Sequence, residues 1–348
     1  MSTVRPVLRA ALTAALVATL LSCGGGDDEG ADEASTEPPT AAAEATATPE
    51  VTYLPEGDLP DPLTLKDVDG RTIPAKPFAD FAVATGDGVW VTGVQPGAVR
   101  YDDVSGDITA RTPVRGSVGQ ALEESGGEVL VPTGGPSALL RLDAVNGEVR
   151  SRVPLPGSPV SEGVVGADDD AAYVLVDPMT PTIAVVEGDR VTDTIPAPTA
   201  ATAVRAAFGA LWVPTSLHAV ERLDLASDEW TTIPTGPRPR FLDVGFGAVW
   251  VMNQGDGSVT RIDAQTAETE AVPVTGEAIG GGDLTTGAGA VWLRTDTAVA
   301  RIDPDSRAVT HWIDLPPGSG SVAATDRALW ITNHDHLAVH QVPLPLPR

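Results

Sequence analysis

Short runs of apolar residues, bounded by glycine and acidic residues, recur along the chain from residue 88 to the C-terminus. The clearest run is residues 247–251, with the sequence Gly-Ala-Val-Trp-Val, and two degenerate copies lie at 128–131 and 172–174. Close copies lie at residues 88–91, 209–213, 289–293 and 327–331. If residues 90, 130, 173, 212, 250, 292 and 330 are equivalent "Trp positions", their spacings are 40, 43, 39, 38, 42 and 38. The chain therefore contains seven units of about 40 residues.

A second landmark, an Arg-x-Asp triplet, follows the Trp position by about ten residues in most units. The triplets are residues 100–102, 141–143, 222–224, 261–263 and 301–303. Turn residues and another β-rich run come next, so each unit predicts four short strands. Seven such units predict an all-β, seven-bladed β-propeller with four-stranded blades. We expect the Trp rings to pack between blades and the triplet Asp to cap the next turn.

The two ends of the repeat region complement each other. The last unit, residues 321–345, has its three inner strands but lacks an outer one, whereas residues 69–74 resemble the outer strands of other units. A strand around Arg71 to Pro74 should therefore complete the seventh blade and close the ring, which removes exposed sheet edges. We assign the propeller to residues 63–348.

Residues 1–22 have the features of a bacterial lipoprotein signal peptide. Arg5 and Arg9 precede an apolar run over residues 10–21 that is too short to span a bilayer permanently. Residues 20–23, Leu-Leu-Ser-Cys, resemble a lipobox, and Cys23 is the only cysteine of the chain. The resemblance implies that Cys23 is the lipid-attachment site, and no internal disulfide is possible.

Residues 23–62 predict a disordered, acidic tether. The stretch 24–62 contains eleven acidic residues and no Lys or Arg, so it cannot bury enough apolar surface to fold. We expect a protein that is anchored to the cell membrane by its N-terminal lipid only and faces the extracytoplasmic side. Loss of Arg5 and Arg9 with the signal peptide changes the net charge from −26 to about −28. Such a charge excludes attraction to nucleic acid, and we expect a monomer.

The loops after the Trp strands and between units should share one face of the ring, where propeller ligands usually bind. Several arginines belong to this predicted face: Arg115, Arg238, Arg240 and Arg294. Together they can receive an anionic ligand or a partner's carboxylate. The alternative is that they pair with the many acidic residues of the chain itself.

Polar residues of the same loops are further candidates for ligand or partner binding. They are His218, Asn253, Asp256, Asn333, His334, Asp335 and His336. His334 and His336 can share a metal or supply a base near neutral pH, but we favour the alternative interpretation, a solvated polar loop. The other two histidines, His311 and His340, lie in predicted strands and should be structural. We find no second cluster at metal-ligand spacing, and we expect no cofactor.

The Gly-x-Val-Trp-Val and Arg-Ile-Asp repeats over residues 65–345 resemble NHL/YVTN-type propellers, and within them virginiamycin B lyase-like proteins. That group includes sensors, scaffolds and a few enzymes. We therefore predict a non-catalytic module that binds or senses a small molecule or an envelope protein. One alternative is a lyase in which His334 or His336 acts with a divalent metal. Another is a scaffold for envelope assembly.

Overall fold

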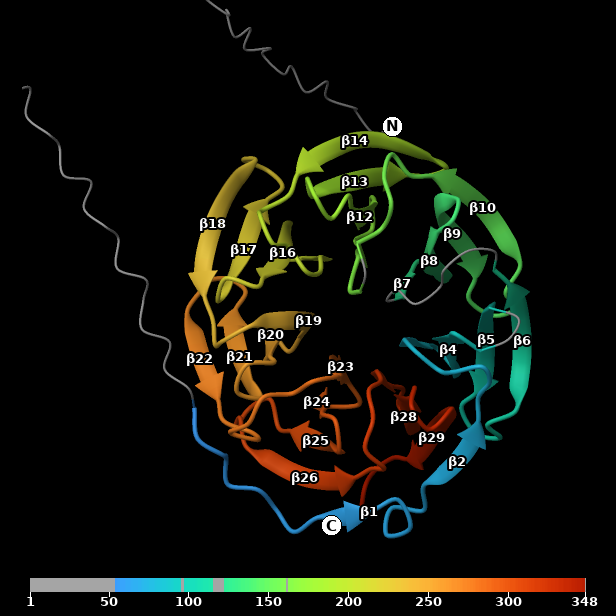
Figure 1. The fold of residues 1–348 in the computed structure, drawn as a ribbon, viewed down its shortest axis with the longest axis vertical. Helices are drawn as coiled ribbons and strands as arrows, with labels where there is room; N and C mark the ends of the chain where they lie inside the picture. Colours follow the sequence, from blue (N-terminus) through green and yellow to red (C-terminus); the bar gives the residue numbers. More distant parts are fainter. Residues whose placement is uncertain (1–53, 95–96, 115–121, 161, 348) are drawn as a thin grey trace, which may run out of the picture. The chain divides into compact units, whose positions relative to one another are not determined.

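The computed structural model describes residues 54–347 apart from 95–96, 115–121 and 161, and these residues form seven β-sheets around a central axis (Figure 1). The predicted all-β, seven-bladed propeller is confirmed, with six sheets of four strands and one of five. In each blade the inner strands follow the order of the chain from the axis outwards, and N-terminal strands are added at the outside of the last two blades. Within the described part of the chain, no helix is long and apolar enough to cross a membrane.

The first four blades each comprise four consecutive strands. Blade 1 contains β3 (Ala82–Thr85), β4 (Gly88–Thr92), β5 (Gly97–Asp102) and β6 (Ile108–Pro113). Blade 2 contains β7 (Glu123–Ser125), β8 (Glu128–Gly134), β9 (Ser137–Asp143) and β10 (Val149–Pro154). Blade 3 contains β11 (Val165–Ala167), β12 (Ala172–Val176), β13 (Thr182–Glu187) and β14 (Arg190–Pro196). Blade 4 contains β15 (Arg205–Ala207), β16 (Ala210–Thr215), β17 (Ala219–Asp224) and β18 (Glu229–Pro234).

The last three blades follow the same plan, with additions from the N-terminal segment. Blade 5 contains β19 (Pro239–Gly245), β20 (Ala248–Asn253), β21 (Ser258–Asp263) and β22 (Thr269–Val272). Blade 6 contains β23 (Asp283–Gly287), β24 (Ala290–Arg294), β25 (Ala298–Ile302), β26 (Val309–Asp314) and the short β1 (Leu63–Thr64). Blade 7 contains β27 (Val322–Ala324), β28 (Ala328–Asn333), β29 (Ala338–Pro343) and β2 (Arg71–Pro74).

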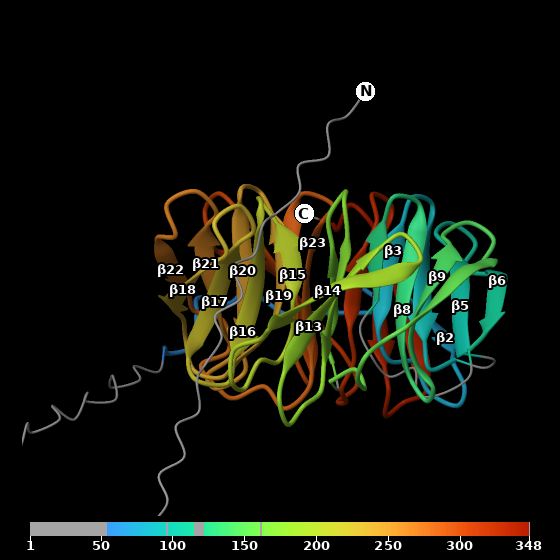
Figure 2. The same cartoon turned by 90° about the horizontal axis from the view of Figure 1, so that it is seen from above.

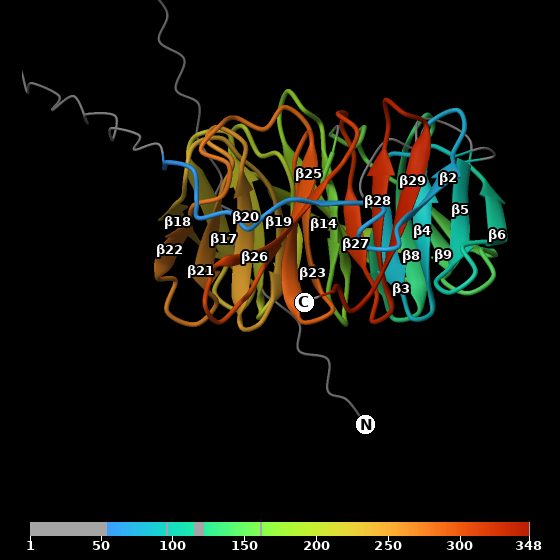
Figure 3. The ribbon, with the colours of Figure 1, turned by 90° about the horizontal axis from the view of Figure 1, so that it is seen from below.

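The N-terminal strand closes the ring as predicted. β2 pairs antiparallel with β29, with Arg71 opposite Gln341 and Pro74 opposite Ala338. The structure adds a contact that we did not predict, because β1 pairs in parallel with β26 as a fifth strand of blade 6. The N-terminal segment thus runs along the outside of blade 6 before it enters blade 7 (Figure 3).

Residues 54–62, which the composition assigns to the tether, contact blade 5 in the structure. The amide of Gly57 donates to the carbonyl oxygen of Val274 at 2.9 Å, and the amide of Leu54 donates to the Asp256 carboxylate at 3.0 Å. The side chain of Leu59 packs against the core shared by blades 5 and 6. Contacts with the propeller therefore extend nine residues further toward the N-terminus than residue 63. That residues 23–53 form a disordered tether stays a prediction.

The repeat residues have the structural roles expected of them. The Trp side chains at the five Trp positions that hold this residue, 90, 212, 250, 292 and 330, are almost completely buried. They belong to cores that join neighbouring blades. Each triplet Asp caps its turn: Asp263, for example, accepts hydrogen bonds from the amides of Gln265 and Thr266 at 3.0 and 3.1 Å. In most blades a glycine before the Trp strand occupies a tight hairpin turn. In blade 5, Phe246 and Gly247 both have positive φ, 55° and 71°, a conformation that glycine adopts without strain.

The strands run from one face of the ring to the other (Figures 2 and 3). We call the face that carries the connections after the Trp strands and between blades the loop face. The opposite face carries the tight turns between the first and second and between the third and fourth strands, and we call it the turn face.

Candidate functional site

The wall of the central channel is set by the pairing of the two inner strands of each blade. The residue seven positions before each Trp position lies directly opposite it on the innermost strand. These residues are Val83, Glu123, Gly166, Arg205, Asp243, Thr285 and Ala323. All of them except Gly166 line a cavity of about 290 Å³. A single sequence offset therefore defines one layer of the channel wall.

This layer contains an arginine surrounded by carboxyl groups. The Nε of Arg205 lies 3.5 Å from Glu123 and 4.0 Å from Asp243, each measured to a carboxylate oxygen. Asp283, on the adjacent inner strand of blade 6, accepts a hydrogen bond of 2.6 Å from the Ser321 hydroxyl. Burial raises the pKa of Glu123 and that of Asp283, each to about 7. The channel therefore holds carboxyl groups that gain and lose protons near neutral pH.

Two phenylalanines meet in the channel on the loop-face side of this layer. Phe81 belongs to blade 1 and Phe241 to blade 5, and their ring centroids are 6.0 Å apart although these blades are not neighbours. Both side chains are buried, with 6% and 5% of their surface exposed. The contact crosses the channel and narrows it below the loop face.

Four titratable side chains from blades 1, 3, 5 and 7 gather above this phenylalanine pair, and we call them the mouth cluster: Asp80, Glu162, Arg240 and His334. Arg240 forms an ion pair of 2.6 Å with Glu162, and its guanidinium lies over the Phe241 ring at 5.5 Å. The His334 ring meets Phe78 edge-on at 4.8 Å. Burial raises the pKa of Asp80 to about 6, the Glu162 charge adds to this rise, and His334 opposes it.

The predicted loop residues fall into two groups, of which the first lies at the surface. Its members are His218, Arg238, Arg240, His334, Asp335 and His336, with the side chains of His218 and Arg240 half-buried. The amide of Arg238 donates to the Nδ1 of His218 at 3.3 Å, which joins two loops of blades 4 and 5. Within the described residues, the Arg238 guanidinium has no carboxylate partner, whereas Arg240 pairs with Glu162 as the alternative interpretation proposed.

The second group is buried and holds the loops together: Asn253, Asp256, Arg294 and Asn333. Arg294 lies at the loop-face end of β24 as expected, but its side chain is 0% exposed and its Nη2 donates to the Gly318 carbonyl oxygen at 2.7 Å. Burial lowers the pKa of Arg294 to about 10. The expectation that Arg294 presents its guanidinium on the rim is therefore corrected, because its position at the end of an apolar strand draws it between blades.

The remaining predicted residues bear on metals and lipid. His334 and His336 are both exposed, and the described chain contains no group of three or more His, Cys, Asp or Glu side chains placed to hold a metal ion. His311 lies in outer strand β26, and His340 is buried in β29, where its Nδ1 lies 2.9 Å from the Thr72 hydroxyl. Arg115 and Cys23 lie outside the described residues.

Of the mouth cluster, Arg240 and His334 were among the predicted residues, whereas Asp80 and Glu162 were not, and the charged residues of the inner strands were not predicted either. A signal was present, since Glu123, Arg205 and Asp243 stand at the same offset from the Trp position, where the corresponding residues of blades 1 and 7 are Val83 and Ala323. The carboxylates of Asp80 and Glu162 lie just before inner strands and carry no comparable pattern. Only the geometry brings them to one mouth.

Comparison with known proteins shows the fold and no closer relationship. No protein-family model matches the chain, and no curated protein matches it. Among solved structures, BamB from Moraxella catarrhalis matches with a TM-score of 0.52 and 12% identity, over 76% of this chain and 84% of that one. The WD40 β-propeller domain of Doa1 matches with a TM-score of 0.63 and 13% identity, over 79% of this chain and 96% of that one. These similarities support the propeller architecture and leave function to the site.

Proposed function

We propose that this protein is a non-catalytic propeller that binds a protein partner through its loop face. The observation that carries the proposal is the convergence of the mouth cluster above the Phe81–Phe241 contact. Because these rings narrow the channel below the loop face, the cluster offers charges of both signs on a broad surface rather than inside a deep pocket. Such a surface suits a macromolecule better than a small ligand.

Exposed apolar side chains on the same face support this proposal. Met179 is 93% exposed, Leu217 64% and Leu337 38%, and all three lie in connections that follow Trp strands. Leu217 precedes His218, which contacts the amide of Arg238. Apolar side chains beside an unpaired arginine are typical of the parts of a surface that bind other proteins.

We also propose that a lipid on Cys23 anchors the protein to the extracytoplasmic side of the cell membrane. The lipobox-like residues 20–23 and the acidic stretch that follows support this location. Replacement of Cys23 by Ala should move the protein from the membrane fraction to the soluble fraction. An unchanged membrane fraction would contradict the lipid anchor without affecting the loop-face proposal.

The partner surface can be tested with paired variants on the two faces. We expect crosslinking in the native envelope to link the full-length protein to a partner protein, and Leu217→Asp with Arg238→Glu to abolish the crosslink. Val145→Asp is the matched control, since Val145 is 70% exposed in a turn on the opposite face. Equal loss in both variants, or in neither, would contradict binding through the loop face.

The lyase alternative requires several metal ligands to converge near His334 and His336, and the described residues contain no group of three or more His, Cys, Asp or Glu placed to hold a metal ion. The described carboxylate that interacts with His334 is Asp80, and its raised pKa reduces its charge near pH 6. A double variant, His334→Ala with His336→Ala, tests this alternative, because any metal-dependent lyase activity that the variant retains would exclude these histidines from catalysis.

A further inference from the structure

Blade 2 has an aliphatic residue, Leu130, at its Trp position, whereas blade 3 has Tyr173 and the other five blades have Trp. Leu130 pairs with Glu123 on the inner strand and with Arg141 on the third strand. Trp212 has the same two pairings in blade 4, with Arg205 and Arg222. Leu130 therefore occupies the place of an indole ring in the repeat.

The arginine opposite the Trp position normally covers the aromatic ring. The guanidinium carbon lies 5.5 Å from the ring centroid for Arg222 on Trp212, 6.0 Å for Arg261 on Trp250 and 5.9 Å for Arg301 on Trp292. In blade 2, Arg141 has no ring to cover. It donates instead to Glu128 at 2.6 Å and to the Gly188 carbonyl oxygen of blade 3 at 2.8 Å.

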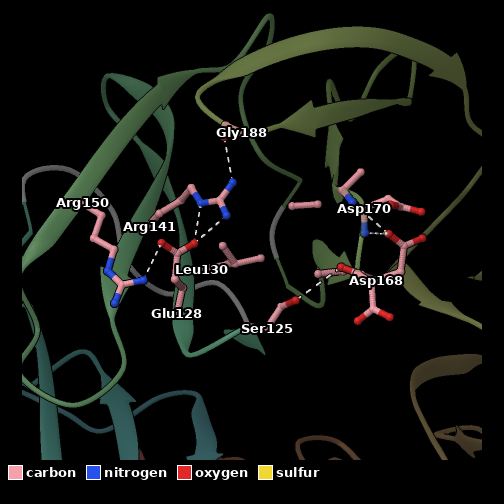
Figure 4. A pocket seen from close by; sticks show the side chains of 13 residues that line it. Ser125, Glu128, Leu130, Arg141, Arg150, Asp168, Asp170 and Gly188 are labelled. Carbon is pink, nitrogen blue, oxygen red and sulfur yellow. Dashed lines mark hydrogen bonds and ion pairs between the residues drawn. The ribbon is translucent and has the colours of Figure 1, made fainter. Parts of the chain in front are cut away.

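A cavity of about 340 Å³ lies between blades 2 and 3 on the turn face (Figure 4). Leu130 and Ala172 supply apolar walls, and the guanidinium of Arg141 lies beside them. The volume is ample for an aromatic ring, since a cavity of about 150 Å³ holds benzene. In the corresponding crevice between blades 6 and 7, Trp292 lines the wall together with Leu344 and Leu346 of the same chain.

The charges around the cavity leave a negative excess. Arg141 and Arg150 both pair with Glu128, and Arg150 also pairs with Asp143 at 2.5 Å, so these charges offset one another. Across the cavity lies the run of Asp168, Asp169 and Asp170 (Figure 4).

The three aspartates of this run differ in their partners. Asp168 is engaged within its own turn, where it accepts hydrogen bonds from the amides of Asp170 and Ala171 and from the Tyr173 hydroxyl. The carboxylates of Asp169 and Asp170 are exposed and have no partner among the described residues. They are free to receive a cation at the edge of the cavity.

We propose that this cavity binds an aromatic ring that carries a cationic amine, as in an arylalkylammonium ion. The ring lies against Leu130 in the place of the missing indole, with its face toward the Arg141 guanidinium, which stacks on aromatic rings even while paired with a carboxylate. The ammonium group lies at Asp169 and Asp170. This site is on the face opposite the proposed partner surface and does not depend on it.

Three probes of matched shape and different charge test the proposal on the purified full-length protein. Isothermal titration should show binding of tryptamine and weaker binding of indole. The difference should be about two- to fivefold, because an exposed ion pair contributes 0.2–1 kcal/mol. Indole-3-acetate should bind least. Equal affinities for the three, or strongest binding of the acetate, would overturn the role of the aspartates.

Variants of the cavity give an independent test. Leu130→Trp restores the repeat residue, so it should abolish binding of tryptamine and indole and raise the midpoint of thermal unfolding. If the Leu130→Trp protein does not fold, Leu130→Phe should have the same two effects to a smaller extent. Undiminished binding in a folded variant would place the ligand elsewhere and refute the proposal. Asp169→Asn with Asp170→Asn should reduce tryptamine to the affinity of indole. The control, Asp228→Asn with Asp305→Asn, changes two exposed carboxylates on other blades and should change nothing.

The source of the ring is distinguished by a further probe. A short peptide with Lys next to Trp presents the same two groups as tryptamine, an indole ring and an ammonium group, on a polypeptide. Tighter binding of the peptide than of tryptamine indicates that the cavity receives a side chain of a protein, and tighter binding of tryptamine indicates a free amine. Binding of neither overturns the proposal.

Discussion

The indole nitrogen of Trp330 in blade 7 donates a hydrogen bond of 2.8 Å to the carboxylate of Asp103, which lies 227 residues earlier in blade 1. The Thr325 hydroxyl donates to the other carboxylate oxygen at 2.6 Å, and all three side chains are buried. In blade 5, by contrast, the indole of Trp250 donates to the carbonyl of Gly245 within the same blade. The seam where the ring closes is therefore held by a buried carboxylate as well as by β2.

Replacement of Trp330 by Phe should destabilise the protein more than the same change at Trp250. Both variants lose similar ring area, but Trp330→Phe also removes one of the donors to the buried Asp103 carboxylate. An unsatisfied buried charged group costs about 1–3 kcal/mol or more. Urea unfolding should show a free energy of unfolding lower for Trp330→Phe by about that amount. Equal losses would mean that the seam hydrogen bond contributes no net stability.

Asp283→Asn should stabilise the protein above neutral pH. The pKa of Asp283 is raised by burial to about 7 from its ordinary value of 3.8, so the folded state binds the proton more tightly than the unfolded state. Stability from this group is therefore largest at acidic pH and falls as pH rises from about 4 to 7. Asparagine is neutral throughout and keeps an oxygen to accept from Ser321. Thermal unfolding midpoints from pH 5 to 8 should decline less in the variant, and the gain at pH 8 should be on the order of 1 kcal/mol.

The exposed Asp305→Asn provides the control for this measurement. Its side chain lies at the surface of a turn, and its replacement should leave the pH profile of the wild-type protein intact. A profile for Asp283→Asn as steep as that of the control would assign the pH dependence to other groups, with Glu123 first among them.

Removal of the N-terminal strand should open the ring. A chain that begins at residue 75 lacks β2 and leaves β29 as an exposed edge, whereas a chain that begins at residue 66 keeps β2 and lacks β1 and the contacts of residues 54–62 with blade 5. We expect the first to unfold at a much lower temperature and to self-associate through the free edge. A synthetic peptide of residues 67–76 should restore its midpoint. No response to the peptide, or equal midpoints for the two truncations, would contradict closure by β2.

His334→Ala should raise the pKa of Asp80 further above its present value of about 6. The imidazolium of His334 favours the ionised carboxylate, so its loss leaves burial and the Glu162 charge to act alone. A carbon-detected NMR titration of the Asp carboxyl groups measures this shift. His311→Ala, in the outer strand of blade 6, should not change it. An unchanged or lower pKa of Asp80 in His334→Ala would show that the His334 charge does not stabilise the Asp80 carboxylate.

The sequence predicted the architecture because the repeat residues act locally. The glycine and tryptophan of a repeat, such as Gly247 and Trp250, specify a hairpin turn and a buried strand through their local conformation and packing. The strand from Arg71 to Pro74 could be assigned because its sequence resembles the other outer strands. The loop residues were harder, because exposure depends on neighbours that are remote in sequence. Asn253 and Arg294 lie at the ends of strands that lead into loop-face connections, yet both are completely buried.

Arg240 and His334 of the mouth cluster were predicted as loop-face residues, but their convergence with Asp80 and Glu162 was not. Asp80, Glu162 and Arg240 come from segments that are about 80 residues apart, and none has an unusual local pattern. The cavity at Leu130 is an intermediate case. The departure from Trp was visible in the alignment of the repeats, but the partnership of Arg141 with Glu128 and the position of the aspartates required coordinates.

The pairing of β2 with β29 joins residues 71 and 341, near opposite ends of the chain. During synthesis from the N-terminus, β2 is made long before β29 and has no partner until almost the whole chain has followed. The other six blades can assemble in this interval, so the ring closes only in the last step. A chain cut short before β29 would therefore keep unpaired edges at β2 and β28, and the integrity of the C-terminal residues decides whether the ring closes at all.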